Sequence, residues 1–173
     1  MLIQSIQWGH PSTNLIAGPS NSGKTSILDK ILHHKNTLFT QSGLKTILFY
    51  NVWTDIYSKW EQEGIINFSS KGIPSLEEFI SLVEFYSSDM GVSVIFDDLG
   101  GEIMKNLNFF EHIFVVLSHH LKITIFLVIH NLFEKGLRKI SLNTSRIILT
   151  SNLRDISQIS HISRRVFLAQ NTF

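Results

Sequence analysis

Residues 15–25 of the chain read Leu15-Ile16-Ala17-Gly18-Pro19-Ser20-Asn21-Ser22-Gly23-Lys24-Thr25. The last eight residues fit G-x-x-x-x-G-K-[ST], the pattern of the phosphate-binding loop of enzymes that act on nucleoside triphosphates. The apolar run before the loop reads as a strand, and residues 25–32 after it read as a helix. Because this motif requires strand, loop and helix in that order, the stretch predicts a nucleotide-binding α/β domain.

Each part of the loop has a chemical task. The glycines permit backbone angles at which successive N–H groups point inward and hold phosphate oxygens. Lys24 is expected to reach the β and γ phosphates, and the Thr25 hydroxyl to ligand Mg²⁺. The partial positive charge at the start of the helix adds to this anion site. We therefore expect ATP and Mg²⁺ as cofactors, with the nucleotide held by Gly18, Pro19, Ser20, Asn21, Ser22, Gly23, Lys24, Thr25 and Ser26.

Length and composition indicate one folded domain. A chain of 173 residues with 43% hydrophobic and 17% charged residues suits a single α/β unit, and we assign residues 1–173 to one domain. Cysteine is absent, which excludes disulfides and thiolate metal sites. Neither a secretory signal nor an apolar run of the roughly 20 residues that span a bilayer is recognisable. We expect a protein that is neither secreted nor in a membrane.

The charges are distributed unevenly along the chain. Residues 1–130 hold eight lysines, twelve acidic residues and no arginine, whereas residues 131–173 hold seven basic residues against two acidic ones. Every arginine lies in this last quarter, and arginine is the side chain suited to bidentate phosphate contact. A solvated basic face is an equally good interpretation of this pattern alone.

Strand-like and helix-like segments alternate along the chain. This alternation predicts a three-layer α/β sandwich with a mostly parallel sheet, helices on both faces, and the strand order 5-1-4-3-2 of the additional-strand type. Ser75 and Glu78 fit a helix capping box ahead of an apolar stripe at helical spacing. The expected strands are 2–8, 14–17, 45–50, 92–96, 123–129 and 146–150, and the expected helices are 25–32, 56–63, one from Ser75, 104–121 and one from Asp155.

An acidic pair, Asp97-Asp98, ends the strand at 92–96. Carboxyl ends of parallel strands meet at one edge of a sheet, so this pair and the phosphate loop are expected to lie together. Asp97 would hold Mg²⁺, directly or through water, and Asp98 would orient or deprotonate an attacking water. The competing interpretation is a pair of carboxylates that cap the loop to the next helix.

His130 and Asn131 end the strand at 123–129, which is expected to lie between the other two. A polar residue there can sense the γ-phosphate through a hydrogen bond, and simple capping of the strand end is an equal alternative. The eight histidines show no metal-binding spacing, since His33-His34 and His119-His120 occupy adjacent helix positions that face apart.

The order of these motifs carries a family resemblance. The chain resembles the FtsK–HerA superfamily of DNA-pumping ATPases, and in particular the genome-packaging ATPases of Polinton-type elements and related DNA viruses. The matching stretches are 18–25, 96–99, 129–136, 138–143 and 153–159. The phosphate loop is common to many families, whereas the block from Asn131 to Ile159 is specific, and the resemblance covers about residues 14–166.

The resemblance implies a motor. Members form homo-oligomeric rings around double-stranded DNA without reading its sequence, and an arginine from the neighbouring subunit completes each nucleotide site. Arg154 is the preferred candidate for that arginine, followed by Arg138, with Arg146 as a third. A capsid or portal protein would be a further partner, and the protein would act in the infected host cell or at the virion vertex. No membrane partner is implied.

Two features depart from the family. Its sensor glutamine corresponds to His130, and its members continue beyond the final helix, so we expect a compact or truncated version with weakened activity. Two other functions stay open. A small nucleotide or nucleoside kinase shares the loop and the size, but it would need neither the Asp97-Asp98 pair nor the specific block. An assembly module that binds ATP and hydrolyses it weakly would fit the two departures.

Overall fold

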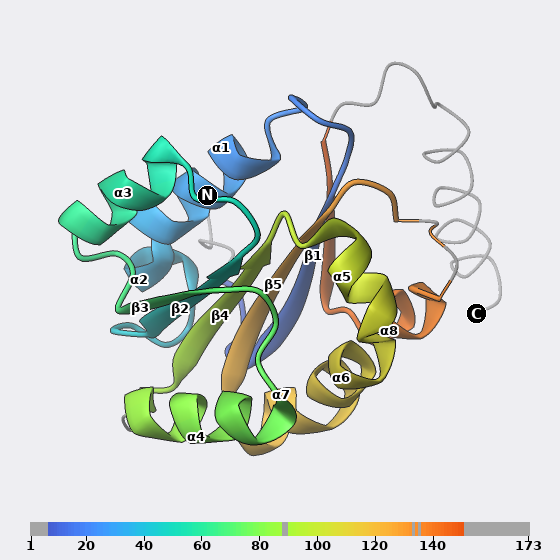
Figure 1. The fold of residues 1–173 in the computed structure, drawn as a ribbon. Coiled ribbons are helices and arrows are strands. Elements are labelled where there is room, and N and C mark those ends of the chain that lie inside the picture. The colour runs from blue at the N-terminus through green and yellow to red at the C-terminus, as the bar shows by residue number, and fades with distance from the viewer. Residues whose placement is uncertain (1–6, 88–89, 133, 135, 151–173) are drawn as a thin grey trace, which may run out of the picture.

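The fold is a single parallel sheet between two layers of helices (Figure 1). The computed structural model describes residues 7–87, 90–132, 134 and 136–150. All five strand pairings are parallel. The expected three-layer α/β sandwich of the P-loop type is therefore confirmed.

The strands and helices follow one another closely along the chain. The strands are β1 (Ser12–Ala17), β2 (Lys45–Tyr50), β3 (Phe68–Lys71), β4 (Val92–Asp97), β5 (Ile123–Ile129) and β6 (Arg146–Leu149). The helices are α1 (Lys24–His33), α2 (Lys35–Leu38), α3 (Asp55–Gln62), α4 (Leu76–Tyr86), α5 (Gly100–Lys105), α6 (Leu107–His112), the π-helix η1 (Ile113–Leu117), α7 (Ser118–His120) and α8 (Arg138–Leu142).

The strand order is β3-β2-β4-β5-β1-β6. Without β3, the remaining five strands numbered along the chain run 2-3-4-1-5, which is the expected order 5-1-4-3-2 taken from the other edge. The sequence interpretation missed β3, because Phe-Ser-Ser-Lys offers neither an apolar run nor an alternating pattern. This added strand forms one edge of the sheet.

Burial explains why the central strands are apolar throughout. Every residue of β1, β4 and β5 is buried, as expected for strands covered on both faces. One core lies between the sheet and α4, α5, α6, η1 and α8, with Phe79, Phe110 and Phe114 among its buried side chains. The second core lies beneath α1, α2 and α3, and includes Leu28 and Trp60. Among the residues that the structure describes, no helix is long and apolar enough to cross a membrane.

Helix α4 begins as the sequence predicts. The Ser75 hydroxyl accepts from the Glu78 backbone N–H at 3.3 Å, and the Glu78 carboxylate accepts from the Ser75 N–H at 2.8 Å. Both halves of the capping box are therefore made. Phe79 and Val83 of the predicted stripe are buried, and Leu82 and Tyr86 pack against the same core.

The helix predicted over 104–121 is confirmed over most of its length and wrong at its start. α6, η1 and α7 follow one another without a gap over 107–120, whereas a separate helix, α5, begins four residues before the predicted start, at Gly100. Asn106 separates α5 from α6, with φ −117° and ψ 31° and its side-chain amide donating to the Glu102 carbonyl. The Glu102 carbonyl also accepts the Asn106 backbone N–H at 3.1 Å, so the amide adds to the last turn of α5 and the break lies in the backbone angles of Asn106.

Two predicted elements involve residues outside the described ranges. Of the strand predicted at 2–8, only its last two residues are described, and Trp8 forms an isolated bridge with Phe39. The predicted final helix from Asp155 lies wholly outside the described residues.

Candidate nucleotide and metal site

The predicted site residues come together at the carboxyl edge of the sheet. A cavity of about 200 Å³ is lined by Ser20, Asn21, Lys24, Thr25, Thr54, Tyr57, Asp97, Asp98, Val128 and His130. These residues come from the loop after β1, the start of α1, α3, and the ends of β4 and β5. Ligand sites in parallel sheets occupy this position beyond the strand ends. Its volume lies below the range for a whole small-molecule pocket, so it matches the phosphate end of a nucleotide.

The loop between β1 and α1 has the backbone that an anion site needs. Asn21 and Gly23 adopt positive φ values of 60° and 89°, which turn the backbone sharply into the helix. No side chain of the described residues caps the first turn of α1, and no acidic residue lies in that turn, so its N–H groups can bind a ligand. Ser26 is exposed on this turn and does not line the cavity.

Lys24 is turned toward its own loop. Its Nζ donates to the carbonyl oxygens of Gly18 and Pro19, both at 2.8 Å. Burial lowers the pKa of this amine, and the charges of Asp97 and Asp98 act in the opposite direction. The amine thus lies between the loop and the acidic pair, in a position to bind a phosphate group.

Asp97 is a buried carboxylate with one specific side-chain partner. Only 4% of the residue is exposed, and the Tyr57 hydroxyl donates to its Oδ2 at 2.8 Å. Burial raises the pKa of Asp97, while the Tyr57 hydrogen bond and the Lys24 charge oppose that shift. Burial and the neighbouring carboxylate likewise raise the pKa of Tyr57, so its phenol stays a donor. Sequence reasoning missed Tyr57, because no local pattern links it to a residue 40 positions away.

Asp98 and His130 face each other beside Asp97. Asp98 follows the strand with a positive φ of 55°, and its side chain is half exposed. Its Oδ1 lies 3.4 Å from Nε2 of His130. His130 also borders a second cavity of about 340 Å³, lined by Gly100, Gly101, Ile103, Ile129, His130, Asn131, Glu134 and Leu137. Asn131 therefore lies in the second cavity and not in the first.

Thr150 clamps the phosphate loop from the end of β6, and sequence reasoning missed it as well. Its hydroxyl donates to the Ala17 carbonyl at 3.3 Å and bonds the Ser22 hydroxyl at 2.5 Å. A Cβ atom added at Gly18 would overlap Thr150 Oγ1, far closer than any real contact allows. The first glycine of the motif is therefore required by this close approach.

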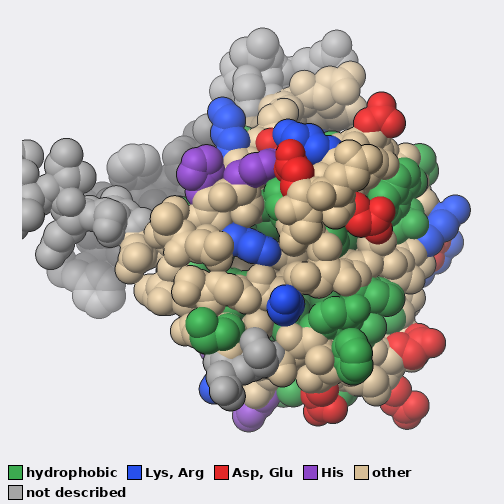
Figure 2. Space-filling view, turned by 90° about the vertical axis from the view of Figure 1, so that its left-hand side faces the viewer, with side chains coloured by type: hydrophobic (Ala, Val, Ile, Leu, Met, Phe, Trp, Pro, Cys, Tyr) green, Lys and Arg blue, Asp and Glu red, His purple; other side chains and the backbone are tan. Residues whose placement is uncertain are grey.

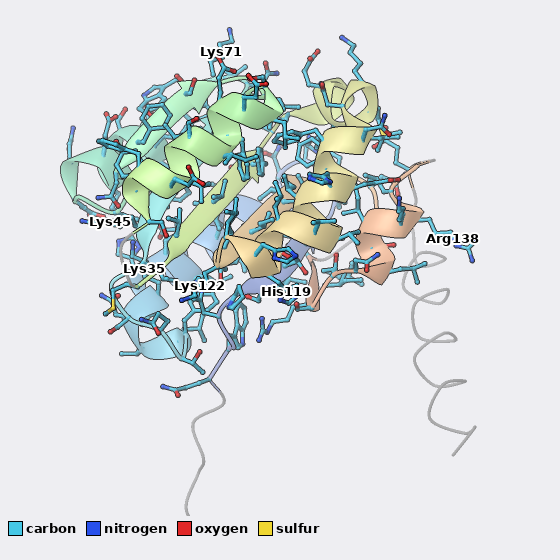
Figure 3. The ribbon with its side chains drawn as sticks, turned by 90° about the horizontal axis from the view of Figure 1, so that it is seen from below. Lys35, Lys45, Lys71, His119, Lys122 and Arg138 are labelled. Atoms are coloured by element: carbon cyan, nitrogen blue, oxygen red, sulfur yellow. The ribbon has the colours of Figure 1, made fainter. Side chains whose placement is uncertain are left out.

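The two candidate arginines that the structure describes lie in different elements. Arg138 is the first residue of α8 and its side chain extends away from the sheet (Figure 3). Arg146 is held within its own chain, since Nη1 donates to Asn14 Oδ1 at 3.3 Å and the guanidinium lies 4.8 Å from the Trp8 ring centroid. Arg146 is therefore engaged by residues of its own chain, away from the phosphate loop. Arg154 lies outside the described residues.

The donor set fits Mg²⁺ accompanied by a triphosphate. Thr25 and Asp97 line one cavity and offer a hydroxyl and a carboxylate, the oxygen ligands that Mg²⁺ accepts. No group of three or more His, Cys, Asp or Glu side chains within the described ranges could hold a metal alone. Mg²⁺ is usually held by one or two protein oxygens together with water and phosphate, so two protein ligands suffice.

A larger hollow lies elsewhere. It measures about 750 Å³ and lies between β3 and α4, with Phe68, Ile73, Leu82 and Phe85 in its lining. Figure 2 shows apolar side chains gathered low on this side of the molecule, with acidic side chains beside them. The hollow contains none of the predicted site residues, so its size does not make it the nucleotide site.

Comparisons with known proteins show the fold. The chain is similar to the cytoplasmic domain of EssC, with a TM-score of 0.59 and 12% identity over 87% of this chain and 33% of that one. It is also similar to the cytoplasmic domain of the Thermomonospora curvata type VII secretion ATPase EccC, with a TM-score of 0.52 and 16% identity over 78% of this chain and 20% of that one. No protein-family model and no curated protein matches the sequence.

The chain thus spans a third or less of the solved chains that it matches. Identities this low carry the architecture and not the activity. Neither protein is described as viral or as a packaging enzyme, so the Polinton and viral part of the resemblance gains no support from them and stays a prediction.

Proposed function

We propose that the chain is a Mg²⁺-dependent ATPase that uses the cavity between the phosphate loop and the end of β4. The observation that carries this proposal is the convergence of Lys24, Thr25, Asp97 and Asp98 on one cavity from segments some seventy residues apart. A basic group for phosphate, two oxygens for the metal and a second carboxylate form the minimum set for nucleotide hydrolysis. EccC, which shares this architecture, is a secretion ATPase, so the fold is one on which this reaction class occurs.

The roles follow from where each group lies. Lys24 exchanges its bonds to the loop carbonyls for phosphate oxygens, and the N–H groups at the start of α1 hold the same phosphates. Thr25 and Asp97 would hold Mg²⁺, which supplies charge neutralisation on the phosphates when it is bound. Asp98 is half exposed and can accept a proton from water, and His130 at 3.4 Å orients that carboxylate.

The finer proposal is a motor that moves double-stranded DNA, without reading its sequence, into the capsid of a virus or virus-like element. The resemblance of residues 131–159 to packaging ATPases and the basic last quarter of the chain support it. A homo-oligomeric ring, an arginine supplied by the neighbour (Arg154 or Arg138) and a capsid or portal partner belong to this proposal. So does action in the host cell or at the virion vertex.

A second candidate is a small-molecule phosphotransferase. The observation that favours it is the cavity of about 340 Å³ beyond His130, because a kinase needs an acceptor pocket next to the phosphate end of its nucleotide. Asp98 borders the first cavity and faces His130, so it could serve an acceptor hydroxyl as well as water.

Measuring ATP turnover with and without duplex DNA tests these proposals. For the motor, turnover should rise with DNA, fall at least about a hundredfold in Lys24→Ala, and be lost in Asp98→Asn while ATP still binds. Transfer of labelled phosphate to a nucleoside or nucleotide, with no effect of DNA, would favour the kinase. If ATP binds but neither assay shows turnover, the chain is better explained as an ATP-binding assembly module. If ATP does not bind at all, the proposed site is refuted.

A further inference from the structure

Helix α3 supplies a hydrogen bond that fixes one side of the acidic strand end. The Tyr57 hydroxyl donates to Oδ2 of Asp97 at 2.8 Å, and both side chains are almost wholly buried. No other side chain within the described residues forms a hydrogen bond to the Asp97 carboxylate. The backbone N–H of Asp98 also donates to this carboxylate, so Tyr57 is its one side-chain donor among the described residues and not its only donor. The torsion that turns an aspartate carboxylate is soft, and a strong buried donor helps to decide which oxygen faces which neighbour.

Tyr57 itself is held firmly. Its ring centroid lies 5.8 Å from that of Tyr50, 5.7 Å from Trp53 and 5.4 Å from Trp60. Only 2% of Tyr57 is exposed. A side chain enclosed on three sides by rings keeps its hydroxyl in one place, so the position of the donor is set by the core and not by solvent.

The same helix is tied to the phosphate loop. Trp60, one turn after Tyr57, donates from Nε1 to Oδ1 of Asp29 at 2.7 Å. Asp29 lies on α1, the helix that begins with Lys24 and Thr25. Helix α3 therefore contacts both halves of the site, the loop helix through Trp60 and the acidic strand through Tyr57.

We propose that Tyr57 is the positioning residue for the metal-holding carboxylate: it occupies Oδ2 of Asp97 and leaves Oδ1 as the oxygen offered to the cation. This inference rests on the proposed function, because it concerns the Mg²⁺ that accompanies the nucleotide. Outer-shell partners of metal-holding carboxylates typically change metal affinity about 10- to 100-fold when removed. The role thus predicts a specific loss of cation affinity, with phosphate binding retained.

The test compares Tyr57→Phe with Tyr50→Phe in the full chain. Both changes delete one phenolic oxygen from the same cluster of aromatic rings. The Tyr57 hydroxyl donates to Asp97, whereas the Tyr50 hydroxyl forms no hydrogen bond with any described residue, so only Tyr57→Phe removes a hydrogen bond. Binding of a fluorescent, non-hydrolysable ATP analogue is titrated first in EDTA and then against Mg²⁺. We expect Tyr57→Phe to bind the analogue normally in EDTA and to need about tenfold more Mg²⁺ for half-maximal enhancement, and Tyr50→Phe to match the wild type.

The outcomes separate the inference from the function. Unchanged Mg²⁺ dependence in Tyr57→Phe overturns the positioning role, and so does an equal loss of binding in EDTA, which would mean general damage to the cavity. A thermal melt of each variant shows that it is folded, since the ring remains in place. A wild-type chain that binds no analogue with or without Mg²⁺ refutes the proposed function itself, before any substitution is made.

Discussion

Replacing Thr150 by valine should weaken both the fold and the phosphate loop. Valine keeps the shape and the β-branched character of threonine, so the change removes only the hydroxyl that bonds Ser22 Oγ and the Ala17 carbonyl. Each such bond contributes about 1 kcal/mol, and Thr150 is only 5% exposed, so water cannot replace them fully. The expected loss in the free energy of unfolding is about 1.5–3 kcal/mol. If up to about 1.4 kcal/mol of this lost free energy had stabilised the nucleotide-binding conformation of the loop, ATP binding would weaken by as much as about tenfold.

Equilibrium urea unfolding and ATP-analogue titration measure the two effects. Thr144→Val is the matched control. The Thr144 hydroxyl also donates to a backbone carbonyl, that of Ile140, at 2.8 Å, but Thr144 lies two residues after the end of α8 and away from the phosphate loop. It should cost about 1 kcal/mol in stability and leave nucleotide affinity unchanged. If Thr150→Val affects the analogue no more than Thr144→Val does, the clamp on the phosphate loop does not exist.

Three other predictions concern the scaffold. Burial lowers the pKa of Lys35 to about 8, with Lys45 beside it (Figure 3), so the unfolded chain binds more protons than the folded one between about pH 8 and 10.5. Stability should therefore rise over that window by about 1–2 kcal/mol, and Lys35→Met should abolish the rise in pH-dependent urea unfolding. Ser75→Ala should lower the free energy of unfolding by about 1 kcal/mol, because it removes the capping box, and Ser81→Ala on the same helix should lower it less. Gly91→Ala should lower the melting temperature by several degrees, since an added Cβ would overlap His10 Nε2 and φ there is 79°; an unchanged melt would contradict this close approach of Gly91 and His10.

Local patterns were sufficient for most of the fold. Strands with continuous apolar runs, such as 45–50 and 123–129, were predicted with the bounds that the structure has. The capping box at Ser75 was also predicted, since its two bonds join residues three positions apart. Strand order followed from the motif class, because the phosphate loop and the acidic pair occupy fixed places in such sheets.

Most of the misses depend on long-range contacts. β3 is a strand because it pairs with β2, although the sequence of its four residues shows no pattern typical of a strand. Tyr57 and Thr150 reach the site from α3 and from the end of β6, and neither carries a signal within a few residues of itself. The break at Asn106 is a local feature, and the sequence interpretation did not use this asparagine as a signal for a helix end.

The contacts of Lys24 bear on how tightly the loop binds an anion. Two backbone carbonyls accept two of the three hydrogens of this ammonium group, so an anion that takes over the amine completely must replace both bonds. An incoming phosphate therefore competes with the loop's own carbonyls for Lys24, while the N–H groups at the start of α1 add to what the anion gains. The affinity of the loop for an anion is then the difference between two sets of bonds to the same amine, and not the strength of the new set alone.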